Sequence, residues 1–205
     1  MRNKLNHTPE WKSMIRLDVL APGRLERDGE GKVIDADSTC MLIRTDNGLI
    51  VVDPSTNYMR PMIKDSLRRY GVLFGDVSAV VLTHAHADHI QNLSLFLKAA
   101  IYIHEGEDIE IEGAIVVKEE EMQLVPGVRL VHTPGHTYGS MSVFVDADRR
   151  YVIAGDAIPT ESNYRKMYPP AVNCNAEAAL QSIKKIKRYA DVIIPGHGFP
   201  FMARM

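Results

Sequence analysis

Four potential metal ligands stand close together in one short stretch of the sequence, Thr83-His84-Ala85-His86-Ala87-Asp88-His89. Imidazole nitrogens and carboxylate oxygens are ligands that suit Zn²⁺, iron and Mn²⁺. The small residues Ala85 and Ala87 alternate with the ligands, which allows neighbouring side chains to converge on one point. A lone histidine is usually an ordinary core or surface residue, but this density is difficult to explain by packing. The stretch therefore predicts a metal centre.

Later clusters supply further ligands of the same kind. They are Thr133-Pro134-Gly135-His136, Ala154-Gly155-Asp156 and Pro195-Gly196-His197. In each cluster a glycine precedes the ligand and permits a tight turn that can aim the side chain inward. The remaining histidines lack such a setting, and we assign none of them to metal: His7, His104 and His132.

The elements that must position these clusters can be predicted from the sequence. Residues 77–82 form a short apolar run typical of a strand buried on both faces, and this strand leads directly to the histidine cluster. We expect a helix over residues 89–97 after the cluster. Further strands are predicted at 101–103, 114–117, 128–132, 140–145, 151–154 and 192–194. The ligands therefore stand where strands give way to loops, as in active sites built on α/β sheets.

Helix and turn signals complete the predicted framework. Apolar residues recur at helical spacing over 59–70, with Pro61 near the start, and over 176–189, with Asn175 as the N-cap. The dipeptide Asn47-Gly48 favours an antiparallel hairpin between strands at 38–44 and 49–53. The polar segment 22–37 is expected to be a long loop or a hairpin.

Composition indicates one globular domain. The 205 residues are 45% hydrophobic, which is enough for a single well-filled domain over residues 1–205. Cys40 and Cys174 follow neither a disulfide framework nor a C-x-x-C pattern, so we expect free thiols in a reducing compartment, by default the cytoplasm. We expect neither secretion nor membrane insertion. A formal net charge of −2 gives no general attraction to nucleic acid.

With these motifs in this order, the sequence resembles the metallo-β-lactamase superfamily over residues 14–199. The resemblance implies an α/β fold, a four-layer αββα sandwich with two mixed sheets face to face and a metal site at one edge between them. It also implies that Asp53, at the end of the strand 49–53, orients a ligand histidine. The implied ligands form two sets bridged by Asp156: His84, His86 and His136 for the first metal ion, and Asp88, His89 and His197 for the second.

The chemistry implied by this resemblance is hydrolysis by a hydroxide that bridges two divalent ions. Zinc is the expected metal, with Mn²⁺ and Fe²⁺ as alternatives. Asp88 would orient the hydroxide and pass its proton to the leaving group, and Tyr138 would donate a hydrogen bond to a developing oxyanion. Lactam-hydrolysing members with two zinc ions usually carry a cysteine in place of Asp156. We therefore expect a small ester, thioester or lactone as substrate.

Substrate contacts are expected from the segment 157–175, because specificity usually resides in loops on a rigid scaffold. Arg165 and Lys166 would bind a carboxylate or phosphate of the substrate, and Tyr164 or Tyr168 would cover it. We assign no role to Cys174, which lies in the same segment.

Two other functions stay open from the sequence. A phosphodiesterase or ribonuclease would use the same dinuclear site, and it would show a continuous basic groove that joins Arg165 and Lys166 to another cationic cluster. A mononuclear iron oxygenase of the same fold would leave several ligands of the second metal unused. A nucleic-acid partner is open but not favoured, no membrane partner is expected, and association into a homo-oligomer is left open.

Overall fold

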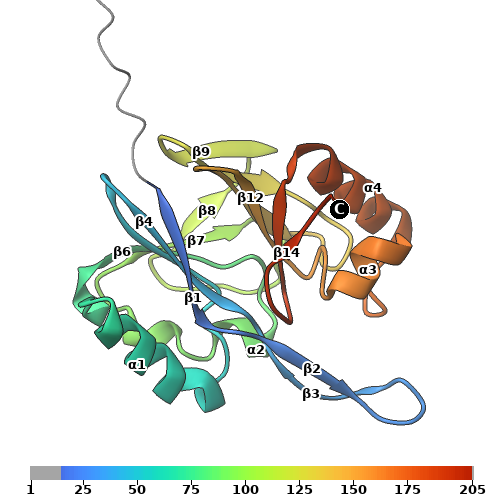
Figure 1. Ribbon diagram of the computed structural model, residues 1–205, viewed down its shortest axis with the longest axis horizontal. Helices are drawn as coiled ribbons and strands as arrows, with labels where there is room; N and C mark the ends of the chain where they lie inside the picture. The colour runs from blue at the N-terminus through green and yellow to red at the C-terminus, as the bar shows by residue number, and fades with distance from the viewer. Residues whose placement is uncertain (1–14, 205) are drawn as a thin grey trace, which may run out of the picture.

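Two mixed six-stranded β-sheets stand face to face in the computed structural model of the chain, which describes residues 15–204 (Figure 1). The first sheet has the strand order β1 (Arg16–Ala21), β4 (Cys40–Thr45), β5 (Gly48–Val52), β6 (Val77–Val81), β7 (Ala100–His104) and β8 (Ile115–Val117). The second sheet has the order β14 (Phe201–Met202), β13 (Val192–Pro195), β12 (Arg150–Gly155), β11 (Met141–Asp146), β10 (Val128–His132) and β9 (Glu121–Val125). Strands β5 to β8 run parallel, as do β12 and β13, whereas the other pairs in both sheets are antiparallel.

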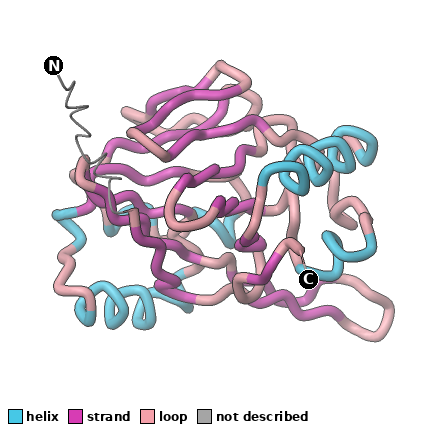
Figure 2. Tube along the Cα trace, turned by 45° about the horizontal axis from the view of Figure 1, so that its top comes forward, coloured by secondary structure: helices cyan, strands magenta, loops and turns pink. Residues whose placement is uncertain are grey.

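The longer helices lie on the outer faces of the two sheets. Helix α1 (Arg60–Arg69) packs on the first sheet, and helices α3 (Glu161–Lys166) and α4 (Ala176–Tyr189) pack on the second. Figure 2 shows these helices on opposite sides of the stacked strands. Short 3₁₀ turns occupy Asn57–Met59, Phe74–Asp76 and Leu93–Leu95. The order of layers is helix, sheet, sheet, helix, and the predicted αββα sandwich is confirmed.

Alternation along the strands fills the apolar layers between these elements. In β4, Met41 and Ile43 point into the core between the sheets, whereas Cys40 and Leu42 point into the core beneath α1. All four side chains are at most 2% exposed. Because both faces of the central strands are buried, the loops that leave their ends start from fixed positions.

The hairpin prediction from Asn47-Gly48 is confirmed. Strands β4 and β5 pair antiparallel, with Thr45 opposite Gly48 at the turn. The segment 22–37 also contains a hairpin, formed by β2 (Arg24–Arg27) and β3 (Val33–Asp37), which is a separate two-stranded sheet that projects from the sandwich (Figure 1).

The predicted helix over residues 89–97 is wrong in its extent. Only a single turn, α2 (Ala87–Ile90), is helical, and a 3₁₀ turn follows it. The backbone carbonyl of His89 accepts a hydrogen bond from the Ser55 amide at 3.0 Å instead of continuing a helix. The buried side chain of Asn92 donates to the Pro54 carbonyl at 2.9 Å and fastens the chain to the loop after β5. These contacts turn the chain away from a helical path.

Both cysteines are free thiols, as predicted, with Cys40 buried and Cys174 exposed.

Between residues 15 and 204, no helix is long and apolar enough to cross a membrane. Asn175 caps α4 as predicted, because its side-chain oxygen accepts a hydrogen bond from the Ala178 amide at 3.0 Å.

Candidate metal centre

The loop after β6 and the loop after β10 bring three imidazoles together. Nδ1 of His86 lies 3.1 Å from Nε2 of His84 and 2.9 Å from Nε2 of His136. Ring nitrogens at such separations can share a single cation, because metal–nitrogen distances of about 2.0–2.1 Å place tetrahedral ligands roughly this far apart. We call His84, His86 and His136 the first ligand group.

Helix α2 and the loop after β13 form a second ligand group, made of Asp88, His89 and His197. Oδ2 of Asp88 lies 3.7 Å from Nε2 of His89 and 3.6 Å from Nε2 of His197. The two imidazoles and the carboxylate thus face a common point, which is again the arrangement of ligands around a cation.

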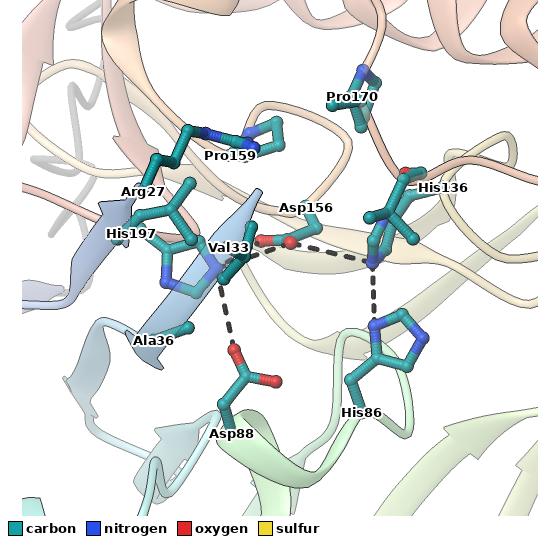
Figure 3. Close-up of a pocket in the computed structure, with 13 residues that line it drawn as sticks. Arg27, Val33, Ala36, His86, Asp88, His136, Asp156, Pro159, Pro170 and His197 are labelled. Carbon is teal, nitrogen blue, oxygen red and sulfur yellow. Dashed lines mark hydrogen bonds and ion pairs between the residues drawn. The ribbon is translucent and has the colours of Figure 1, made fainter. Parts of the chain in front are cut away.

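Asp156, at the end of β12, lies between the two ligand groups (Figure 3). Its Oδ1 is 3.6 Å from Nε2 of His89 and 3.3 Å from Nε2 of His197. Its Oδ2 is 3.5 Å from Nε2 of His136 in the first group. Oδ2 also lies 3.4 Å from Nε2 of His197, so this carboxylate reaches both ligand groups and could contribute to two cations.

Buried atoms without partners show that the site fits cations. Among residues 15–204, Nε2 of His89 and Oδ1 of Asp156 are buried and have no hydrogen-bond partner. Leaving buried polar atoms unpaired costs about 1–3 kcal/mol each, so native structures rarely leave such atoms without a reason. Both atoms lie at the second ligand group, 3.6 Å from each other. A divalent cation there would satisfy both.

The ring nitrogens that face away from the site are held by the surrounding structure. Nδ1 of His136 donates to the Val172 carbonyl at 2.7 Å, and Nδ1 of His197 donates to the Asp37 carbonyl at 2.9 Å. Nδ1 of His89 lies 2.8 Å from Oδ2 of Asp53. With the proton fixed on Nδ1, each ring presents the lone pair of Nε2 to the site, as a metal-binding histidine requires.

Asp53 follows β5 in a left-handed conformation with φ of 49°. Besides its contact with His89, its carboxylate accepts hydrogen bonds from the amide of Thr83 at 2.8 Å and from the hydroxyl of Thr83 at 2.7 Å. The Thr83 hydroxyl in turn lies 3.1 Å from Nδ1 of His84. The structure therefore places Asp53 behind the histidine loop, in contact with a ring of each ligand group directly or through Thr83.

The electrostatics of the site favour bound positive charge. Burial alone would raise the pKa of Asp156, but His197 and His89 outweigh it and hold that pKa well below its ordinary value. Burial lowers the pKa of His84 well below its ordinary value, and the neighbouring His89 adds to this effect, which favours the neutral ring. Burial also acts to lower the pKa of His89, but Asp53 and Asp156 raise it well above its ordinary value. The buried carboxylates thus require positive charge, which protons or metal ions can supply.

Two of the predicted glycine turns are required by close approach. A Cβ at Gly196 would lie 1.9 Å from Oδ1 of Asp156, in the space of the bridging carboxylate. A Cβ at Gly135 would lie 2.2 Å from the backbone nitrogen of Ala179, and the φ of Gly135 is +132°. Only glycine fits these positions, which lie next to His197 and His136.

Glu107 is a site residue that the sequence did not indicate. One oxygen of its carboxylate accepts a hydrogen bond from the amide of Ala85 at 2.9 Å, and the other accepts from the hydroxyl of Thr137. Ala85 lies between His84 and His86, and Thr137 follows His136. The carboxylate therefore holds together the two loops that carry the first ligand group. No motif marks Glu107, since its partners are distant in sequence.

Two adjoining cavities open onto the ligands. The first, of about 160 Å³, is lined by ligands from both groups and by an apolar wall. The wall residues are Leu25, Val33, Ala36, Pro159, Pro170, Ala171 and Val172. The second, of about 500 Å³, shares His86, His136 and Val172 with the first and includes Tyr138 and Cys174. Tyr138 is 69% exposed at this second cavity.

Helix α3 places the predicted substrate-binding residues elsewhere. Tyr164 is 2% exposed, packs in the core beneath α4, and donates its hydroxyl to the Ala203 carbonyl at 3.0 Å. Arg165 pairs with Glu161 at 2.9 Å and donates to the Met202 carbonyl at 2.7 Å. Neither these two residues nor Lys166 line the cavities at the ligands. The structure therefore does not place Tyr164, Arg165 and Lys166 at the cavities, because α3 packs against residues 202–203.

His104 and His132 belong to neither ligand group. Their rings stack on one another with centroids 4.0 Å apart, and Nε2 of His132 lies 2.8 Å from the Tyr138 carbonyl. The sequence assigns neither of them to metal. His7 lies outside the described residues.

Comparisons with known proteins point to one superfamily. Residues 34–113 and 101–197 match the profile of the Metallo-beta-lactamase superfamily. The chain is 37% identical over 151 residues to the probable metallo-hydrolase of Methanocaldococcus jannaschii, and the aligned region covers 72% of this chain and 70% of that protein. It is 33% identical over 183 residues to metallo-beta-lactamase domain-containing protein 1 of Xenopus laevis, which covers 85% of this chain and 76% of that protein. It is 25% identical over 195 residues to an N-acyl homoserine lactonase of a Bacillus species, which covers 77% of this chain and 78% of that protein.

Solved structures share the fold. A Thermotoga maritima protein named as a metallo-beta-lactamase superposes with a TM-score of 0.77 at 21% identity, over 92% of this chain and 99% of that one. An N-acyl homoserine lactone hydrolase, solved with the product N-hexanoyl-L-homoserine bound at its catalytic metal centre, gives a TM-score of 0.69 at 21% identity, over 89% of this chain and 92% of that one.

Proposed function

The chain belongs to the metallo-β-lactamase superfamily and is a metal-dependent hydrolase with a dinuclear-type His/Asp site, and we propose that it cleaves a small ester, thioester or lactone. The observation that carries this proposal is the placement of Asp156 between two ligand groups beneath a largely apolar cavity. The site can polarise a carbonyl, and the cavity wall can bind an uncharged hydrocarbon body.

In this proposal the first ligand group would hold one divalent cation, the second ligand group would hold another, and Asp156 would contribute to both. The donor set of imidazole and carboxylate fits zinc, with Mn²⁺ and Fe²⁺ as alternatives. When bound, two such ions supply a Lewis acid and a water of lowered pKa. Asp53 and Glu107 would hold the ligand loops in position, Asp53 through His89 and Glu107 through the amide of Ala85.

Asp88 has a further task in the proposal. It is the more open of the two carboxylates among the ligands, with its side chain 24% exposed against 11% for Asp156, and it lines the cavity. Its carboxylate can accept a proton from the attacking water and return it to the leaving alcohol or thiol. Tyr138, at the mouth of the adjoining cavity, is proposed to donate a hydrogen bond to the developing oxyanion.

The choice of substrate class is supported by relatives and by the cavity. Two of the compared proteins are named for action on N-acyl homoserine lactones, and one of them was solved with a hydrolysed lactone at its metal centre. The two solved structures described above share the sandwich fold of this chain. The apolar wall of the first cavity, with residues such as Leu25 and Val33, suits an acyl chain.

Phosphodiester cleavage was expected to require a continuous basic groove through Arg165 and Lys166. Arg165 is occupied by Glu161 and by backbone carbonyls, and the lining of the first cavity contains a single cationic side chain other than histidine, Arg27. An iron oxygenase was expected to leave ligands of the second metal unused, whereas Asp88, His89 and His197 lie together here. Both features favour carbonyl hydrolysis.

A substrate panel tests the proposal. We expect the zinc-loaded protein to hydrolyse short acyl 4-nitrophenyl esters, acyl thioesters or N-acyl homoserine lactones, with kcat/KM at least about 10³-fold above that for bis(4-nitrophenyl) phosphate and a short RNA. Turnover would be followed by nitrophenolate, thiol or proton release. A preference for the phosphodiesters, or dioxygen consumption by an iron-loaded protein, would contradict the proposed substrate class.

A further inference from the structure

The β2–β3 hairpin has two chemically different faces. Pairing of Leu25 with Ala36 and of Arg27 with Val33 puts these four side chains on one face, and all four line the first cavity. We call this the inner face. Register puts the other charged residues of the two strands on the opposite, outer face: Arg24, Glu26, Asp35 and Asp37. Every acidic residue of these two strands therefore lies on the outer face, and the inner face carries one charge, that of Arg27.

The two arginines of the hairpin differ in their partners. Arg24 is fully engaged on the outer face, because its guanidinium contacts Asp37 at 2.6 Å, Asp35 at 2.5 Å and Glu26 at 2.9 Å. Arg27 donates from Nη1 to the Gly31 carbonyl at 2.7 Å and forms no ion pair with any residue in the range 15–204. Most of its hydrogen-bond donors are unused by protein partners, although acidic residues stand on the same two strands.

The position of Arg27 relates it directly to the ligands. It lines the same cavity as Asp88, Asp156 and His197, and Figure 3 shows its side chain extending from the hairpin among the residues of this pocket. The remainder of the wall around it is apolar. A molecule bound at the ligands would therefore meet one positive side chain, that of the exposed Arg27, and hydrocarbon elsewhere in the wall.

From this geometry we propose that Arg27 is an anion-binding residue of the substrate pocket, and that the substrate carries a carboxylate separate from the bond that is cleaved. The proposal rests on the proposed function and narrows its substrate class to anionic esters, thioesters or lactones. A guanidinium matches a carboxylate through two parallel hydrogen bonds, which fixes orientation as well as charge. The apolar wall then contacts the hydrocarbon between the carboxylate and the scissile carbonyl.

Paired substrates test this role. Mono-4-nitrophenyl glutarate carries a free carboxylate, and 4-nitrophenyl butyrate is its neutral counterpart of similar length. We expect Arg27→Gln to raise the KM for the glutarate ester about tenfold, with kcat little changed and the butyrate ester unaffected. The wild-type preference for the glutarate ester should also weaken as salt is added.

Lys32→Gln is the matched control, because it removes one positive charge from the exposed turn of the same hairpin, and Lys32 does not line the cavity. It should leave the ratio of the two KM values at the wild-type value. If Arg27→Gln leaves that ratio unchanged as well, Arg27 does not bind the substrate anion, while hydrolysis of the esters still supports the proposed function.

Calorimetry makes the test independent of turnover. Glutarate and butyrate would be titrated into metal-loaded wild-type protein and into the Arg27→Gln variant. We expect glutarate to bind more tightly than butyrate to the wild type, and this preference to fall about tenfold in the variant. The same result in a protein that cleaves none of the esters would keep the anion site and reject the proposed function. Equal preferences in both proteins would overturn the anion site.

Discussion

Replacement of Asp156 with asparagine is expected to lower kcat/KM of the metal-loaded protein by about 10³-fold or more. The carboxylate oxygens of Asp156 face both ligand groups, at 3.3–3.6 Å from Nε2 of three histidines. An amide offers only one oxygen and turns an NH₂ group toward one of the cations. Loss of several kcal/mol of transition-state charge stabilisation corresponds to a rate loss of this order. Steady-state kinetics with the best ester of the panel would measure it.

The same change on the surface provides the control. Asp46 is exposed in the turn between β4 and β5, and Asp46→Asn should leave kcat/KM within about twofold of the wild type. Far-ultraviolet circular dichroism should show that Asp156→Asn keeps the fold. A folded Asp156→Asn protein with wild-type turnover would show that the bridging carboxylate is not used in the reaction.

Glu107→Gln is expected to weaken binding of one cation about 10–100-fold, while the second is held as before. The Glu107 carboxylate accepts from the Ala85 amide with one oxygen and from the Thr137 hydroxyl with the other. Glutamine can accept in only one of these positions, so the loops that carry His86 and His136 lose a common anchor. Competition of the protein with a chromogenic chelator would measure the two affinities separately.

The neighbouring residue Glu105 supplies the control for this prediction. It is exposed on the same loop, and Glu105→Gln should leave both cation affinities unchanged. If Glu107→Gln also binds both cations with wild-type affinity, the carboxylate does not position the first ligand group. If it weakens both cations equally, its effect is on the fold as a whole and the assigned role is wrong.

The parts of this protein that could be predicted from its sequence depend on short-range patterns. The apolar run before Thr83 forms strand β6, because both of its faces are buried. The ligand-rich loop directly follows this strand. The Asn47-Gly48 turn and the Asn175 cap are set by neighbouring backbone. Glycine beside each of His136, Asp156 and His197 marks close approach, which the distances around Gly135 and Gly196 show.

The parts that could not be predicted depend on contacts between distant segments. Glu107 acts on residues 22 and 30 positions away, and nothing around it in the sequence shows this. The segment 157–175 does line the cavities, with Pro159 and residues 170–174, but its helix α3 buries Tyr164 against Phe201 and ties Arg165 to the chain near Ala203. The positively charged residue in the cavity wall, Arg27, comes from β2. The two faces of this strand are distinguished only by its pairing with β3.

The measurement that tests the central claim most directly is the number of metal ions bound per chain. Purified protein would be stripped with a chelator, titrated with Zn²⁺ and analysed by calorimetry and elemental analysis after removal of excess metal. Two ions per wild-type chain are expected, since the first and second ligand groups share Asp156 as a common ligand. A protein that stays metal-free, or one that binds a single ion with Zn²⁺ in excess, would contradict the dinuclear site on which the account depends.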